Sequence, residues 1–147
     1  MGRVPRVRLL LLVLVVALGL AAPAAYAVVR TGSDGADRLV GTGGADRLYG
    51  RGGPDRLVGR GGPDLLAGDA GRDRLIGGPG ADTLLGGGGN DIIVAGAGRD
   101  SVAAGAGNDR VGVRGGGRDR VACGPGRDTV RADPGDAVAG DCEIVRR

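Results

Sequence analysis

The chain has 147 residues, of which 34 are glycine, and it contains no phenylalanine, tryptophan, histidine or lysine. Its length suits one domain, but so much glycine and so few aromatic residues exclude a conventional mixed hydrophobic core. The formal net charge of +3 comes from three arginines before residue 9, and the rest of the chain is formally neutral. The basic balance therefore does not indicate a nucleic-acid-binding protein.

The N-terminal segment has the pattern of a secretory signal peptide. Its arginines precede an unbroken apolar run over residues 9–20, and the small-residue triplet Ala25-Tyr26-Ala27 follows. We expect cleavage after Ala27, so that residues 1–27 are removed and the protein is extracellular. The alternative is a retained membrane anchor, because apolar character continues to Val29 with only small interruptions. No cysteine follows the run, so a lipid-anchored lipoprotein is not indicated.

Downstream, an aspartate recurs every nine residues. The series has eleven members, with one inserted residue before the tenth: Asp37, Asp46, Asp55, Asp64, Asp73, Asp82, Asp91, Asp100, Asp109, Asp119 and Asp128. Glycine stands two residues before each of them, and Leu, Ile or Val stands two residues after. Such a period is typical of a solenoid, because each unit is too small to bury its own apolar face.

The residue types also predict the shape of each unit. Glycine permits the positive φ that a tight turn needs, and the three residues after each aspartate favour a short strand. Side chains alternate along a strand, so the aliphatic residue two positions after the aspartate points inward. The predicted inward column is Leu39, Leu48, Leu57, Leu66, Leu75, Leu84, Ile93, Val102, Val111, Val121 and Val130.

Two segments show the unit in full: residues 77–85 read Gly-Gly-Pro-Gly-Ala-Asp-Thr-Leu-Leu, and residues 86–94 read Gly-Gly-Gly-Gly-Asn-Asp-Ile-Ile-Val. They resemble the nonapeptide repeats of RTX, or haemolysin-type, calcium-binding proteins. The resemblance covers residues 32–139. It implies an all-β fold, a parallel β-roll (a β-solenoid) with two repeats per coil. A short lead-in at residues 28–31 precedes the roll, and a C-terminal tail at residues 140–147 follows it.

The same resemblance implies that calcium ions lie between stacked turns, so that aspartates two repeats apart share a site. One edge then carries Asp37, Asp55, Asp73, Asp91 and Asp109, and the other carries Asp46, Asp64, Asp82 and Asp100. All eleven repeat aspartates are candidate ligands, because calcium takes six to eight oxygens, typically carboxylate and carbonyl oxygens. We expect the strongest sites around Asp82, Asp91 and Asp100, whose turns keep the most glycine.

The alternative is that the aspartates only close turns in a metal-free solenoid. Stacked carboxylates repel each other by about 1 kcal/mol per pair in water, and bound calcium would remove that repulsion. Arginines that directly follow a repeat aspartate offer partial neutralisation without calcium: Arg38, Arg47, Arg56, Arg74, Arg110 and Arg120.

Some units depart from the repeat pattern. The second-position glycine is replaced at Ser33, Thr42, Arg51, Arg60 and Asp69, and the first-position glycine at Ala95 and Ala104. Calcium binding in those turns is therefore less well supported. A twelfth unit with Asp136 and Val138 has Pro134 in place of glycine, so we interpret it as a degenerate end.

Cys123 and Cys142 form an even pair. In a protein bound for an oxidising compartment they predict a disulfide that ties the tail to the last repeats. Two free thiols are the alternative. A zinc site is poorly supported, because two sulfurs without histidine fall short of four ligands.

The absent residue types exclude several activities. A P-loop needs lysine and a nucleophilic triad needs its histidine base, and neither residue is present. Identical aspartate units without an aromatic-lined sugar site do not indicate a glycosidase. We therefore expect no enzyme activity, no nucleic-acid partner and no membrane span after cleavage.

Two functions remain. One is an exported protein that calcium folds, and the other is a structural or adhesive solenoid that binds cell-envelope polymers, with calcium only structural or absent. On one outer face, Arg38, Arg56 and Arg74 form a ladder beside Val40, Val58 and Ile76. We expect Arg56 and Arg74 to contact an anionic envelope polymer, with self-association or a merely solvated strand surface as the alternatives.

Overall fold

The structure is a computed structural model that describes residues 26–146. The arginines and the apolar run of the expected signal peptide lie outside the described residues. Within residues 26–146 every regular element is a β-strand, and no helix is long and apolar enough to cross a membrane.

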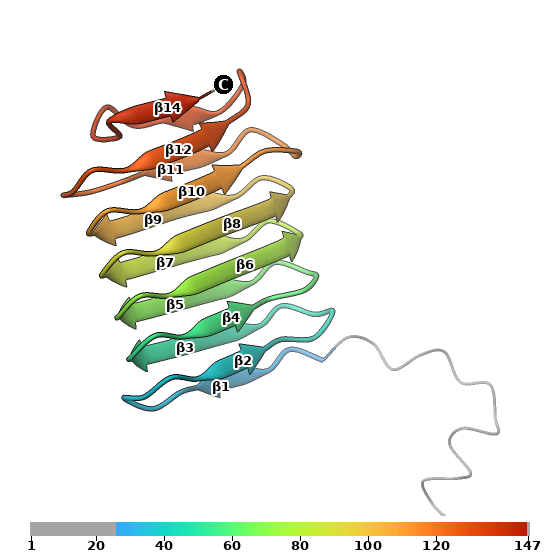
Figure 1. The fold of residues 1–147 in the computed structure, drawn as a ribbon. Coiled ribbons are helices and arrows are strands. Elements are labelled where there is room, and N and C mark those ends of the chain that lie inside the picture. Colours follow the sequence, from blue (N-terminus) through green and yellow to red (C-terminus); the bar gives the residue numbers. More distant parts are fainter. Residues whose placement is uncertain (1–25, 147) are drawn as a thin grey trace, which may run out of the picture.

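Successive strands alternate between two parallel sheets, which together form a β-solenoid of about six turns (Figure 1). We call these the odd sheet and the even sheet. The odd sheet contains β1 (Val29–Thr31), β3 (Arg47–Gly52), β5 (Leu65–Ala70), β7 (Thr83–Gly88), β9 (Ser101–Ala106), β11 (Arg120–Ala122) and β13 (Ala137–Val138). The even sheet contains β2 (Arg38–Val40), β4 (Arg56–Val58), β6 (Arg74–Pro79), β8 (Ile92–Ala97), β10 (Arg110–Val113), β12 (Thr129–Ala132) and β14 (Ile144–Arg146). The predicted β-roll with two repeats per coil is confirmed.

The strand register follows from the repeat length. Two nonapeptides complete one coil, so Leu57 pairs with Leu75, and Leu75 pairs with Ile93. The inserted residue is taken up in the turn between β10 and β11. Val102 therefore pairs with Val121, nineteen residues on, and the aliphatic column is not displaced. Register is held because a slip of one residue would turn every inward side chain to the outside.

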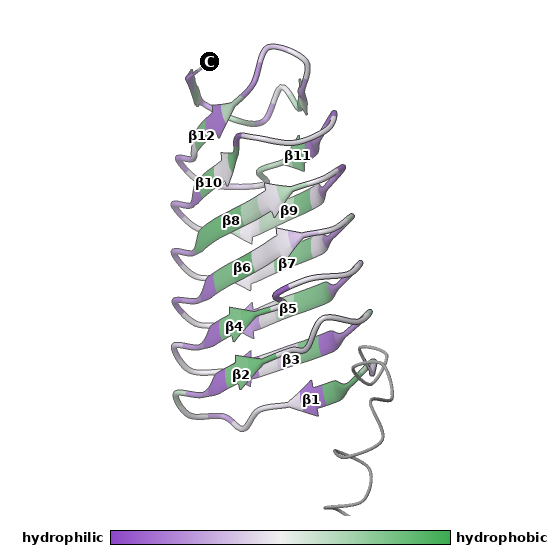
Figure 2. Cartoon of the chain, turned by 90° about the vertical axis from the view of Figure 1, so that its right-hand side faces the viewer, coloured by the Kyte–Doolittle hydropathy of each residue, from purple (hydrophilic) through white to green (hydrophobic). Residues whose placement is uncertain are grey.

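The interior consists of two stacked columns from each sheet. The predicted aliphatic column is buried, with exposed fractions of 0–3% from Leu48 to Val130, while Leu39 at the open end is partly buried. The second inward position lies two residues after each aliphatic one. It is glycine after the first six aliphatic residues, from Leu39 to Leu84, and then Ala95, Ala104, Val113, Cys123 and Ala132, which are all fully buried. Figure 2 shows hydrophobic residues along the strands and hydrophilic residues near the turns.

The strands are longer than the three residues predicted from each unit. In β3 and from β5 to β9 they span six residues and continue through the glycines of the next unit. The lead-in also contributes β1, which pairs with β3, and the tail contributes β14, which pairs with β12. Both ends of the chain thus add strands beyond the eleven regular units.

Candidate metal sites

The repeat aspartates stand at the start of the strands, with their carboxylates turned into the roll. Ten of the eleven have exposed fractions of at most 3%, and Asp37 at the open end is partly buried. Hydrogen bonds join them into the two expected columns. Asp128 extends the column that begins at Asp37, and Asp119 extends the column that begins at Asp46.

Each column is a ladder of carboxylates and amides. The backbone amide of Asp55 donates to Oδ1 of Asp73 at 2.8 Å, and the amide of Asp82 donates to Oδ1 of Asp100 at 2.9 Å. The same bond recurs from coil to coil, so every carboxylate is held in one orientation. Hydrogen bonds between a carboxylate and a backbone amide are charge-assisted and therefore stronger than neutral ones.

Two further acidic residues end the ladders. Oδ1 of Asp136 accepts from the amide of Asp119 at 3.0 Å, and Oε2 of Glu143 accepts from the amide of Asp128 at 2.7 Å. Asp136 keeps the aliphatic residue two positions later, which is the signal that marks it as a repeat member. Glu143 lacks the preceding glycine and is one methylene longer, so the repeat pattern does not identify it.

The second oxygen of most repeat carboxylates has no partner. Oδ2 is buried and accepts no hydrogen bond within the described structure in nine of them: Asp55, Asp64, Asp73, Asp82, Asp91, Asp100, Asp109, Asp119 and Asp128. Native proteins rarely bury a polar atom unpaired, and an ionised oxygen is the most costly case. A proton or a cation would satisfy each of these nine positions.

The aspartates at both ends are different, because protein groups satisfy them. Ser33 donates to Oδ2 of Asp37 from its amide at 2.6 Å and from its hydroxyl at 2.9 Å. Thr42 donates to Asp46 in the same way, and the amide of Asp133 donates to Oδ2 of Asp136 at 2.7 Å. The turn-closing role that was the alternative for all units thus fits the two ends. Ser33 and Thr42 are two of the departures from glycine in the sequence.

Burial is the largest influence on the pKa of the interior carboxylates. It raises the pKa of Asp82 and of Asp91 to about 6, although a backbone hydrogen bond opposes the change. Burial also raises the pKa of Asp73, Asp100 and Asp109. In contrast, the hydrogen bonds from Ser33 hold the pKa of Asp37 below its ordinary value. Without a cation, the middle of each column is thus the part that most readily takes up protons.

Glycine permits close packing of backbone against five of the unpaired carboxylates. A Cβ atom on Gly68 would overlap Oδ2 of Asp73 and lie 2.7 Å from the carbonyl oxygen of Gly86 in the next coil. The same two kinds of oxygen meet beside Gly50, Gly59, Gly77 and Gly86. The aspartates concerned are Asp55, Asp64, Asp73, Asp82 and Asp91. From Ala95 onward, side chains fill this inward position.

This donor set suits a hard cation. A carboxylate oxygen and a backbone carbonyl oxygen are the ligands that calcium prefers, and its variable coordination tolerates sites built from turns. Softer metals select histidine or cysteine, and the chain has no histidine. The residues present therefore fit calcium.

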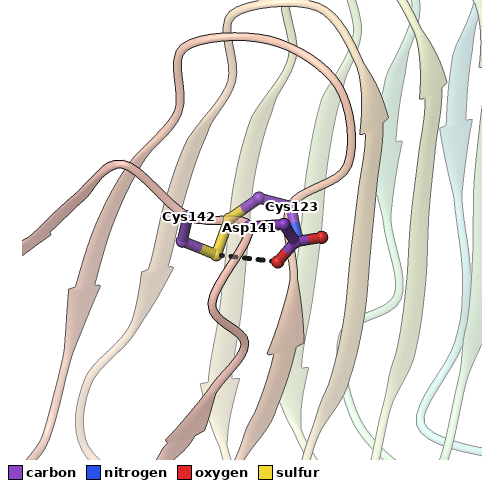
Figure 3. A group of neighbouring side chains, drawn as sticks. All are labelled: Cys123, Asp141 and Cys142. Atoms are coloured by element: carbon purple, nitrogen blue, oxygen red, sulfur yellow. Dashed lines mark hydrogen bonds between the residues drawn. A yellow bond between two sulfur atoms is a disulfide. The ribbon is translucent and has the colours of Figure 1, made fainter.

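Cys123, Asp141 and Cys142 form one other group of potential ligands (Figure 3). The predicted disulfide is present: the two sulfur atoms are bonded to each other, and the Cα atoms lie 5.3 Å apart. Neither sulfur is then a thiolate. Asp141 is also engaged, because Oδ2 accepts from the amide of Gly124 at 2.9 Å, and such backbone hydrogen bonds lower its pKa. This group is a structural tie and not a zinc site.

Comparison with known families agrees with this reading of the repeats. The RTX calcium-binding nonapeptide repeat matches four times, over residues 31–66, 49–84, 59–93 and 85–111. The chain belongs to this RTX repeat family. The matches confirm the resemblance stated from the sequence, and they include all the RTX units from Asp37 to Asp109. No curated protein and no solved structure matches the chain significantly.

RTX β-rolls are typically structural and calcium-binding. In this RTX chain the unpaired Oδ2 atoms lie inside the roll and away from solvent, which suits a held ion better than a turnover site.

Proposed function

We propose that this protein is secreted and that calcium, bound along the two aspartate columns, completes its folding. The observation that supports the proposal best is the set of nine buried Oδ2 atoms without a hydrogen-bond partner. A cation bound to these oxygens would neutralise the carboxylates and relieve repulsion along the column. The free energy of calcium binding then becomes folding free energy, because the site does not exist in the unfolded chain.

We assign the primary sites to Asp55, Asp64, Asp73, Asp82 and Asp91. In each, an unpaired Oδ2 and a carbonyl oxygen of the next coil lie close to the same glycine. Calcium needs six to eight oxygens, so further turn carbonyls and water would complete each shell. Asp100 was expected among the strongest sites, but Ala95 fills the inward position before it, and we place it outside this set.

Secretion fits the remaining features. Disulfides persist in oxidising compartments, and the Cys123–Cys142 bond lies in the described part of the chain. Extracellular calcium is abundant enough to fill sites of modest affinity, whereas cytosolic calcium fills only tight ones. The chain would then be less stably folded before export and would complete its folding after it. We propose no catalytic role.

The test is a calcium titration of the metal-free chain followed by circular dichroism, with magnesium as the matched control. We expect β-sheet signal to increase with calcium, to return to the metal-free level with chelator, and to change little with magnesium, which demands stricter octahedral geometry. Isothermal titration calorimetry of the same samples gives the stoichiometry. An unchanged spectrum together with no calcium uptake would favour the metal-free solenoid.

A further inference from the structure

The outer face of the even sheet is strongly basic. Its seven strands contain six arginines and no acidic residue: Arg38, Arg56, Arg74, Arg110, Arg131 and Arg146. All six are exposed. The odd-sheet strands contain four arginines and also Asp69, so the two faces of the roll differ in charge. We call the even-sheet surface the arginine face.

The first part of this face is a regular ladder. Arg38 pairs in register with Arg56, and Arg56 with Arg74. Neighbouring strands lie about 4.8 Å apart, so the guanidinium groups repeat at that interval along the solenoid axis. Beside them Val40, Val58 and Ile76 form the aliphatic ladder predicted from the sequence.

The second part of the face contains an open hollow of about 580 Å³ on the surface of β8, β10 and β12. Gly112 lies in its lining, next to Val94 on one side and Arg131 on the other. Arg110, Arg131 and Arg146 contribute the charge of its lining, while Ile92 and Val94 contribute apolar surface. A second hollow of about 480 Å³ adjoins it and shares Arg110.

The fold does not require glycine at position 112. Its φ is not positive, and an added Cβ would have only the carbonyl oxygen of Ile93 nearby, at 3.9 Å. The preceding residues of this outward column are Val40, Val58, Ile76 and Val94. Glycine inside a strand costs stability and often marks a place where a ligand comes close to the backbone.

We infer that the arginine face binds a linear anionic polysaccharide that runs along the solenoid axis and is anchored in the hollow at Gly112. Arginine forms bidentate hydrogen bonds with carboxylates, and the aliphatic ladder offers the apolar surface on which a sugar ring packs. The extended row of charges suits a polymer better than a small anion. A single-stranded nucleic acid fits poorly, because no strand of the even sheet carries an aromatic side chain for base stacking.

The proposed contacts are separate from the calcium sites, because the arginines lie outside the roll and the aspartate columns lie inside, so binding is measured with calcium present. We would measure binding of the purified protein to hyaluronate fragments by calorimetry, with neutral dextran and a single-stranded oligonucleotide as comparison ligands. The test pair is Arg110→Glu with Arg131→Glu. The matched pair on the odd sheet is Arg47→Glu with Arg120→Glu, which makes the same change in net charge.

We expect the parent to bind hyaluronate and not dextran, and the Arg110/Arg131 variant to bind at least tenfold more weakly. The odd-sheet variant should change less than threefold. Gly112→Val should also weaken binding at least tenfold while circular dichroism and calcium uptake stay as in the parent. No binding by the parent, equal losses in both charge variants, unchanged binding by Gly112→Val, or preference for the oligonucleotide would each overturn the inference.

Discussion

The backbone amide of Asp73 donates a 2.8 Å hydrogen bond to Oδ1 of Asp91, which lies eighteen residues later and one coil away. That bond fixes the carboxylate and leaves Oδ2 of Asp91 buried without a partner. One residue type thus performs two tasks: it links successive coils, and it presents an oxygen inside the roll. The ladder would therefore position the carboxylates of the proposed cation sites before any ion is bound.

Replacing one interior carboxylate tests the two tasks separately. Asp91→Asn keeps an oxygen that can accept from the amide of Asp73, but it removes the charge that a cation needs. We expect calorimetry to show at least one fewer calcium ion, and the metal-free roll to lose none of its stability, because a repulsive charge is gone. Asp37→Asn is the control, since Ser33 already satisfies that carboxylate, and its calcium stoichiometry should equal that of the parent. Equal stoichiometry in both variants would count against a site at Asp91.

The glycine that flanks each site gives a second prediction. In Gly68→Ala the added methyl would overlap Oδ2 of Asp73 and crowd the carbonyl oxygen of Gly86. We expect loss of calcium at that position and a lower melting temperature in calcium buffer. Gly88→Ala is the matched control, because a Cβ there has no atom within 4 Å and the φ is not positive. If both variants bind calcium equally, the oxygens next to Gly68 are not part of a site.

The pH dependence has opposite signs with and without calcium. Burial raises the folded-state pKa of Asp82 and Asp91 to about 6, from an ordinary value of 3.8. Between those values the folded chain binds more protons than the unfolded chain. The free energy of unfolding of the metal-free protein should therefore fall as the pH rises from about 4 to about 7, and then level off.

Calcium reverses this trend, because it competes with protons for the same carboxylates. Calcium affinity should rise as the pH increases through about 6. Urea unfolding of metal-stripped protein and calcium titrations at pH values on either side of 6 check both slopes. A metal-free stability that rises with pH would contradict the assigned burial of these groups.

Much of the architecture follows from the sequence because the repeat is local. The nine-residue phase predicts the short strands and the buried column from Leu48 to Val130, since both depend only on period and on side-chain alternation. The parallel β-roll with two repeats per coil, and with it the register and the two aspartate columns, is implied by the resemblance to RTX repeats. The disulfide follows from an even pair of cysteines in a chain that the sequence predicts to be exported.

What the sequence pattern does not predict depends on contacts between coils. Asp37 and Asp46 have hydrogen-bond donors for their Oδ2 atoms because Ser33 and Thr42 fold back onto them. These two units therefore differ from the nine units whose Oδ2 atoms have no partner. The sequence does not reveal why the change from glycine to larger residues at Ala95 matters. The structure does, because it places Gly68 against Asp73 and against the carbonyl oxygen of Gly86 in the next coil. Glu143 lies outside the repeat phase and is brought to Asp128 by the disulfide-tied tail.

Backbone strain at three departures from glycine gives a fourth prediction. Arg51, Arg60 and Asp69 adopt positive φ values of 79°, 91° and 69°, where an L side chain costs about 1 kcal/mol. Arg60→Gly should therefore stabilise the roll by roughly 0.5–1 kcal/mol, which chemical denaturation in calcium can measure. Arg99→Gly is the control, because Arg99 has no positive φ, and glycine there only adds freedom to the unfolded chain. A destabilised Arg60→Gly variant would argue for a contact made by the arginine that outweighs the strain.

The last prediction concerns the C-terminal end of the roll, which lies beyond the proposed primary calcium sites. Cys123 is fully buried in the second inward column, and Cys142 lies in the loop between β13 and β14. The bond closes a loop with a sequence separation of 19 residues, for which chain entropy predicts roughly 3 kcal/mol of stabilisation. Cys123→Ala with Cys142→Ala should therefore leave the middle coils folded in calcium, while β13 and β14 lose protection from hydrogen exchange. Those strands are short and cover the C-terminal end of the roll. Their release should therefore also expose a sheet edge and promote end-to-end association. Hydrogen exchange by mass spectrometry and size-exclusion chromatography measure the two effects, and unchanged protection of β14 would show that packing alone holds the tail.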